Sequence, residues 1–211
     1  MNSREEMADV VFTIGHSNHT LEHFISLLKL HNVNAVGDVR SVPYSRMNAQ
    51  FDREDLQESL RRENIVYVFL GEQLGARTSI TDCYEDGTVR YDRLARTNAF
   101  RAGLERVKNG MKRFRLALMC AEKDPLQCHR TILIAPPLEG LGVSVSHIHA
   151  NGALESNAHA IDRLIRQLRI PGMFLDKREL IAEAYRVQES KIAYSQDHAS
   201  SRDLEPKRAI G

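Results

Sequence analysis

The chain has 211 residues, of which 42% are hydrophobic and 27% charged, with a formal net charge of +1. This length is enough for one globular domain with a hydrophobic core. The near-neutral net charge excludes a global electrostatic attraction to nucleic acid, but it is compatible with a local basic patch. The sequence has no apolar run of the roughly 20 residues that a membrane span needs, no signal-peptide pattern and only three cysteines, so we expect a cytoplasmic protein with reduced thiols and no membrane partner.

Strand-like and helix-like patterns alternate along the chain. In chain order we predict a strand (10–14), a helix (21–32), a strand (33–39), a helix (52–63), a strand (65–70), a helix within 91–110, a strand (114–120), a helix (128–140), a strand (143–148) and two helices (156–169 and 174–190). Strands separated by helix-length segments form βαβ units. The pattern therefore predicts a three-layer, Rossmann-like α/β sandwich with a mainly parallel sheet of about five strands.

Two segments lack this periodicity. Residues 71–90 are polar and rich in turn-forming residues, which is typical of a lid or a binding loop. Residues 191–211 are polar and are expected to form a flexible tail. We predict a single α/β domain over residues 8–190 followed by this tail.

Polar motifs follow four of the predicted strands. They are Gly15-His16-Ser17, Asp38-Val39-Arg40, the segment GEQLGAR at 71–77 and the segment CAEKDPLQCHR at 120–130. Ligands of open α/β sheets bind at the carboxyl ends of the strands, and in a parallel sheet these ends share one side. We expect the four motifs to converge on one site.

The segments TIGHSNHTLEHF, DVRSVPYSRMNAQF, IVYVFLGEQLGAR and LMCAEKDPLQCHR resemble, in order and spacing, the signature segments of the DUF488 family of bacterial and archaeal proteins. The resemblance covers about residues 12–148. It implies an α/β sandwich and a site at the DVR and CHR segments, but no established reaction. Two features depart from the family pattern: Ala76 follows Gly75 where two glycines are usual, and Pro136 and Pro137 fall within the helix after the CHR segment, which predicts a short or kinked helix.

The segment Cys128-His129-Arg130 at a predicted helix start allows three kinds of chemistry. The positive end of the helix and Arg130 would lower the pKa of the Cys128 thiol and favour a nucleophile. The same helix start favours an anion such as phosphate. Cys120, Cys128 and His129 together offer metal ligands for zinc or iron, although their spacing is not a standard zinc signature. The structural alternative is a buried Cys128 beside an ion-paired Arg130.

The other candidates divide by residue type. Catalytic candidates are His16, Asp38, Glu122, Cys128 and His129, and substrate-binding candidates are Ser17, Arg40, Arg46, Arg77 and Arg130. Structural roles compete with several of these: an internal Asp38–Arg40 ion pair, a cap of the next helix by Ser17, Asn18 or Thr20, and a salt bridge from Glu122 to Arg40 or Arg130.

Several arginines with few carboxylates indicate an anionic ligand. The first hypothesis is therefore an enzyme that hydrolyses, or transfers a group on, a phosphate-bearing substrate such as a nucleotide or a nucleic-acid fragment. The second is a non-catalytic nucleotide-binding or nucleic-acid-binding module, whose affinity would depend strongly on salt. The third is a metal- or redox-dependent protein built on Cys120, Cys128 and His129.

Overall fold

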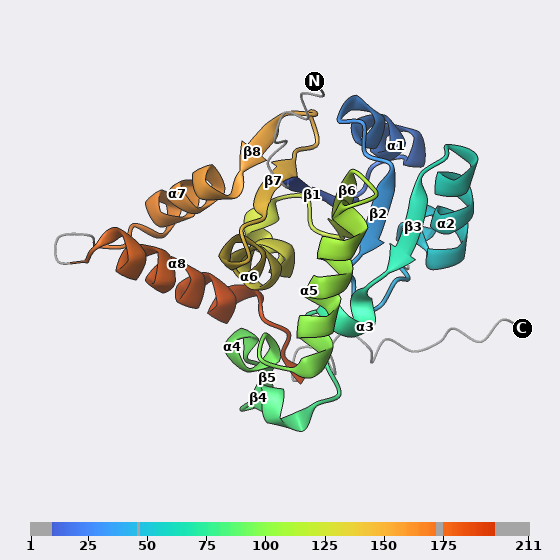
Figure 1. Ribbon diagram of the computed structural model, residues 1–211. Coiled ribbons are helices and arrows are strands. Elements are labelled where there is room, and N and C mark those ends of the chain that lie inside the picture. The colour runs from blue at the N-terminus through green and yellow to red at the C-terminus, as the bar shows by residue number, and fades with distance from the viewer. Residues whose placement is uncertain (1–9, 46, 172–174, 197–211) are drawn as a thin grey trace, which may run out of the picture.

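A six-stranded sheet forms the centre of the protein, seen in a computed structural model that describes residues 10–45, 47–171 and 175–196 (Figure 1). Its strands are β1 (Val10–Gly15), β2 (Ala35–Asp38), β3 (Val66–Phe69), β6 (Leu116–Cys120), β7 (Ser144–Ile148) and β8 (Leu154–Ser156). Their order is β3-β2-β6-β1-β7-β8, and only β8 runs antiparallel, on the edge. The five predicted strands and the mainly parallel α/β sandwich are confirmed; the short strand β8 is an addition.

Helices cover both faces of this sheet (Figure 1). The longer ones are α1 (Leu21–Leu30), α2 (Arg53–Arg62), α5 (Asn98–Met111), α6 (Ala135–Gly140), α7 (Asn157–Leu168) and α8 (Lys177–Ile192), and two single-turn helices are α3 (Gly71–Leu74) and α4 (Tyr91–Leu94). Helices α1 and α2 pack on one face, and α5 to α8 pack on the other.

Burial on both faces explains the apolar strands. Along β6, Ala117 and Met119 point into the core beneath α1 and α2, while Leu116, Leu118 and Cys120 point into the opposite core. A strand alternates its side chains between faces, so a strand covered by helices on both sides is apolar at every position. This places Cys120 at the end of a fully buried strand.

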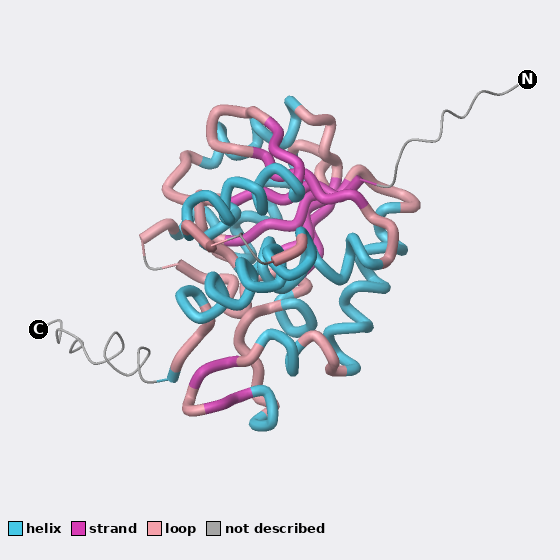
Figure 2. Tube along the Cα trace, turned by 90° about the vertical axis from the view of Figure 1, so that its left-hand side faces the viewer, coloured by secondary structure: helices cyan, strands magenta, loops and turns pink. Residues whose placement is uncertain are grey.

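Residues 71–90 have more structure than the sequence predicts. They contain α3, a 3₁₀ turn (Thr81–Cys83) and a hairpin of β4 (Tyr84–Glu85) and β5 (Thr88–Val89), which lies apart from the main sheet (Figure 2). The first residues of the predicted tail also differ, because α8 continues to Ile192 and Tyr194 accepts a backbone hydrogen bond from Val89. Elements this short carry too little periodicity to be recognised from sequence. The rest of the predicted tail, 197–211, lies outside the described residues.

The helix after the CHR segment is divided at its two prolines. A π-helical turn (Arg130–Ile134) comes first, and the six-residue α6 follows, with Pro136 and Pro137 in its first turn. Proline has no N–H to donate, and the first turn of a helix needs none. The predicted shortening of this helix is confirmed.

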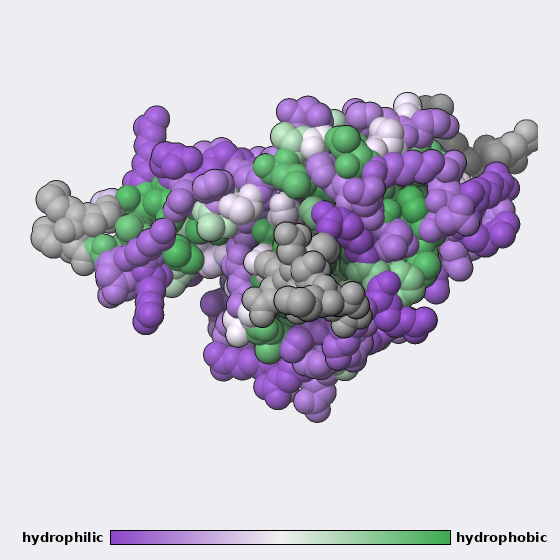
Figure 3. Space-filling view, turned by 45° about the horizontal axis from the view of Figure 1, so that its top comes forward, coloured by the Kyte–Doolittle hydropathy of each residue, from purple (hydrophilic) through white to green (hydrophobic). Residues whose placement is uncertain are grey.

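The surface in the view of Figure 3 is mainly hydrophilic, and hydrophobic residues gather at the end where α7 and α8 meet. Among the described residues, no helix combines the length and the apolar character that crossing a membrane requires.

A buried histidine joins β7 to the first strand and to α7. Thr13 Oγ1 lies 2.8 Å from His147 Nδ1, and His147 Nε2 lies 3.2 Å from Asn157 Oδ1. The amide oxygen of Asn157 can only accept, so Nε2 carries the proton and Nδ1 accepts from the threonine hydroxyl. Burial first, and then the charge of Arg130, lower the pKa of His147 from 6.5 to about 4. The histidine is therefore neutral in the folded protein at neutral pH.

We expect the free energy of unfolding to fall as the pH decreases from 6.5 to 4, because the unfolded chain takes up a proton that folded His147 refuses. The contribution of His147 is complete above pH 6.5 and amounts to roughly 3 kcal/mol over this window. Urea denaturation at a series of pH values should show a shallower pH dependence for His147→Gln than for the wild type. The exposed His159→Gln variant should keep the wild-type slope, and equal slopes in all three proteins would contradict this assignment.

Candidate functional site

Polar residues from three adjacent strands meet at the carboxyl edge of the sheet. Strand β6 lies between β2 and β1, with Gly15 opposite Cys120 and Asp38 opposite Met119. The GHS, DVR and Cys-Glu segments therefore leave the sheet side by side. This register brings the predicted motifs of strands β1, β2 and β6 to one place.

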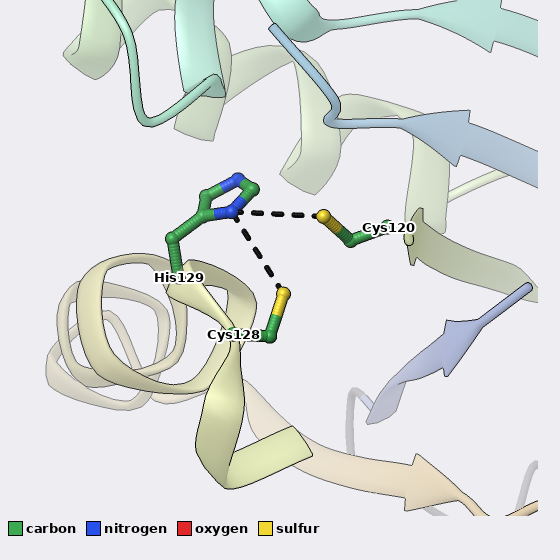
Figure 4. Close-up of side chains that lie close together, drawn as sticks. All are labelled: Cys120, Cys128 and His129. Carbon is green, nitrogen blue, oxygen red and sulfur yellow. Dashed lines mark hydrogen bonds between the residues drawn. The ribbon is translucent and has the colours of Figure 1, made fainter. Parts of the chain in front are cut away.

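Two cysteines and a histidine form the centre of this edge (Figure 4). His129 Nδ1 lies 3.7 Å from Cys120 Sγ and 3.8 Å from Cys128 Sγ, and the three atoms all lie within 4.8 Å of one another. The residues are 4% (Cys120), 1% (Cys128) and 7% (His129) exposed. We call these three residues the Cys–His cluster.

The backbone fixes the orientation of the histidine. His129 Nε2 lies 3.1 Å from the carbonyl oxygen of Val39. A carbonyl oxygen only accepts, so Nε2–H donates to it. The other nitrogen, Nδ1, is thereby directed at both sulfur atoms, as a lone pair when the ring is neutral.

The two thiols differ in acidity although both are buried. The hydrogen bond with Cys128, and then burial, raise the pKa of Cys120 well above its usual value. Burial by itself would raise the pKa of Cys128, but the bond from Cys120 and the positive charge of Arg130 lower it well below that value. In the absence of a bound ion, the negative charge of the cluster therefore resides on Cys128, and that charge raises the pKa of His129 against the effect of burial.

Glu122 connects the cluster with solvent. The residue is exposed, yet its carboxyl group faces both thiols. Partial desolvation of this carboxyl by the surrounding protein, and then the charge of Cys128, raise its pKa. A carboxyl group with a raised pKa beside reactive side chains is suited to proton transfer.

Arg130 is a buried cation without a carboxylate partner. It is 1% exposed, and its guanidinium donates to the carbonyl oxygens of Glu122 (2.8 Å) and Lys123 (3.3 Å). Its Nε atom is buried without a hydrogen-bond partner, and within the described parts of the chain no carboxylate lies within ion-pair distance of it. The alternative of a salt bridge from the Glu122 carboxylate to this arginine is not observed, and Arg130 bonds the Glu122 backbone instead.

Gly15 makes this arrangement of Arg130 possible. A Cβ atom at Gly15 would lie 1.8 Å from the carbonyl oxygen of Glu122 and 3.2 Å from Arg130 Nη2. Only glycine lets the loop after β6 approach the end of β1 this closely.

Asp38 and Arg40 form a buried ion pair. The shortest of their contacts is 2.6 Å, and Asp38 also accepts from the hydroxyl of Tyr67 at 2.8 Å. Arg40 in addition donates to the carbonyl oxygen of Phe51 and contacts His16 Nε2 at 3.3 Å. Of the two roles that the sequence allowed, the internal ion pair is the one observed.

His16 is neutral in this network. Its ring stacks on Phe51 at 4.4 Å, and its Nδ1 lies 2.9 Å from the carbonyl oxygen of Ser17, to which it donates. Nε2 is then free to accept from Arg40. Burial is the main cause that lowers the pKa of His16 to about 4.

The remaining predicted residues lie in different surroundings. Ser17 has a positive φ of 51° and donates to Asn18. Arg77 stacks its guanidinium 4.3 Å from the ring centre of Tyr194. Arg46 lies outside the described residues.

Three features of the site were not predicted from sequence. The hydroxyl of Tyr67 donates to Asp38, and burial and then the charge of Cys128 raise the pKa of Tyr91. The loop between the cysteines is held by Arg163 on α7, which bonds both carboxylate oxygens of Asp124 at 3.1 Å. Asp124 also caps the 3₁₀ turn Pro125–Gln127. In the sequence, the one indication of this cap is that Asp124 directly precedes Pro125, a residue that favours the first position of a helical turn.

A family model for a domain of unknown function, DUF488, matches residues 20–135, more than half of the chain. The chain belongs to the DUF488 family. The match contains the DVR segment and the whole Cys–His cluster of this DUF488 chain, whereas His16 and strand β7 lie outside it. No match was found among curated proteins or among solved structures.

We expect Asp38→Asn to destabilise the DUF488 chain by about 3–5 kcal/mol, because it leaves the buried Arg40 charge without its partner. Glu58→Gln is the control, since it breaks an exposed ion pair with Arg61 that should matter little. Urea denaturation of both variants measures the difference. A loss for Asp38→Asn no larger than that for Glu58→Gln would contradict the importance of the buried pair.

Proposed function

We propose that this DUF488 chain is an enzyme that hydrolyses, or transfers a group on, a phosphate-bearing substrate derived from a nucleotide or nucleic acid. The observation that carries the proposal is Arg130, a buried guanidinium without a carboxylate partner, next to the Cys–His cluster and Glu122. Two carbonyl oxygens satisfy some of its N–H groups but do not neutralise its charge. A buried charge is costly unless it is paired, and an anionic substrate group would provide that pairing.

Glu122 is the proton-transfer group in this proposal. Its raised pKa brings it closer to neutral pH, where a carboxyl group exchanges protons most effectively. It is also the member of the site that reaches solvent, so a substrate would approach past it. In this proposal the reacting atom of the substrate lies next to the Cys–His cluster.

Arg40, Asp38 and His16 act as positioning residues. Arg40 is occupied by Asp38 and Phe51, which leaves Arg130 as the main anion-binding side chain. The carbonyl oxygen of Val39, in the same segment, holds His129. The ion pair therefore serves the site by fixing the backbone between Asp38 and Arg40.

We place the reaction in the cytoplasm. Cys83, Cys120 and Cys128 are free thiols, and the cluster depends on two of them remaining reduced. Cytoplasmic glutathione and thioredoxin keep thiols in this form.

We expect Glu122→Gln to lower turnover by about 100-fold or more, the usual effect of removing a general acid or base. The substrates are a panel of nucleotides and short single-stranded oligonucleotides, with products separated by chromatography. Glu105→Gln, an exposed substitution on α5, is the matched control and should turn over normally.

Binding is measured in parallel at several salt concentrations. Turnover by the wild type that survives unchanged in Glu122→Gln would contradict the role of Glu122. Salt-dependent binding without turnover would favour the hypothesis of a non-catalytic binding module over that of an enzyme. If the protein neither binds nor turns over any of the phosphate-bearing compounds, the proposal is overturned.

A further inference from the structure

The Cys–His cluster has the geometry of a metal site. Tetrahedral zinc holds sulfur at about 2.3 Å and imidazole nitrogen at about 2.0 Å, which places neighbouring ligand atoms about 3.5–3.8 Å apart. The two nitrogen–sulfur distances are 3.7 and 3.8 Å, and the sulfurs lie within 4.8 Å of each other. The ligand atoms thus already face one point between them (Figure 4).

The histidine is oriented as a metal ligand. Its Nε2–H donates to Val39, so the lone pair of Nδ1 is directed at the point between the sulfurs. Metal-binding histidines usually donate their second N–H to a carbonyl or carboxylate oxygen, which fixes the ring and the tautomer.

The backbone holds the ligands in place before any ion binds. Cys120 ends the buried strand β6, while Cys128 and His129 follow a 3₁₀ turn that Asp124 caps and Arg163 ties to α7. Arg130 closes the loop by bonding the carbonyl oxygens of Glu122 and Lys123. A site of this kind binds metal without a large rearrangement.

We propose that Cys120, Cys128 and His129 bind one Zn²⁺ ion, with the fourth coordination position open. Two thiolates and an imidazole suit zinc, and three protein ligands with an open position are typical of catalytic rather than structural zinc. Binding displaces the thiol proton of Cys120, since Cys128 is already ionised, and the two thiolate charges then balance the ion. An iron–sulfur cluster is less suited, because it needs more thiolates, and Cys83 lies in the separate turn Thr81–Cys83.

This inference deepens the proposed function and rests on it for its chemical role. A water molecule in the open position would become a nucleophile at neutral pH, and Glu122, whose carboxyl faces both sulfurs, is placed to accept its proton. Arg130 beside the cluster would hold the negative group of the substrate. Hydrolysis is the reaction class that this arrangement favours.

The test is elemental analysis of protein purified without a metal-binding tag, together with Co²⁺ binding to chelator-treated protein. We expect about one zinc per chain for the wild type, and a loss of about tenfold or more for Cys128→Ser and Cys120→Ser. Cys83→Ser is the matched control, since it also replaces a buried cysteine, and should keep its zinc. Co²⁺ should give the intense visible bands of four-coordinate cobalt and a thiolate charge-transfer band.

If the serine variants fail to fold, the cobalt spectrum of the wild-type protein shows by itself whether thiolates bind the metal. A wild-type protein that holds no zinc after reconstitution with Zn²⁺, and shows no thiolate-to-cobalt band, overturns the metal site. Zinc lost equally from Cys83→Ser would also overturn it.

The metal site and the proposed function can fail separately. Glu122→Gln should keep its zinc while losing turnover. Turnover by metal-free protein would contradict a role for zinc in the reaction and leave the proposed enzyme standing. Bound zinc without turnover of any tested substrate would support the metal site and contradict the proposed enzyme.

Discussion

The guanidinium of Arg130 is the group on which the geometry of the site depends. It extends back from the π-helical turn to the carbonyl oxygens of Glu122 and Lys123, and so closes the loop that separates the two cysteines. Together with the Asp124 cap and Arg163, this closure holds the loop that places Cys128 beside Cys120. Gly15 supplies the room, because any side chain there would collide with the same carbonyl oxygen.

The site combines buried charge with an opening at one residue. Cys128, His129 and Arg130 are buried together. The hydrogen bond from Cys120 and the positive charge of Arg130, which no carboxylate among the described residues pairs, lower the pKa of Cys128 against the effect of burial. Glu122 is attached to the same loop but remains exposed. Chemistry at the cluster would therefore be protected from bulk water while protons still reach it through one carboxyl group.

A second buried network supports this one from the neighbouring strand. The Asp38–Arg40 pair and the hydroxyl of Tyr67 stiffen the end of β2, from which the carbonyl oxygen of Val39 orients His129. The DVR segment thus serves the Cys–His cluster through its backbone as well as through its side chains. Arg40 therefore has a structural role, because its ion pair with Asp38 fixes the backbone that orients His129.

The sequence by itself determined the parallel sheet and the edge at which the polar motifs of β1, β2 and β6 meet. Apolar β-branched segments alternating with helical periodicity predict the five main strands, and polar motifs after those strands must meet at one edge because parallel strands end on the same side. The prolines at 136 and 137 also predicted the short helix α6. These are local signals, carried by residues near one another in the chain.

Only the tertiary structure decided what the side chains at that edge do. The sequence left both Arg40 and Arg130 as candidates to bind an anion, but Asp38 occupies Arg40 while the hydrogen bonds of Arg130 go to carbonyl oxygens. The orientation of His129 depends on a backbone carbonyl 90 residues away, which no spacing pattern encodes. Strand β8 and the hairpin were missed for a different reason, because two or three residues cannot establish a period. Partners of buried polar groups are chosen by the packing of distant segments, and that choice exists only once the chain has folded.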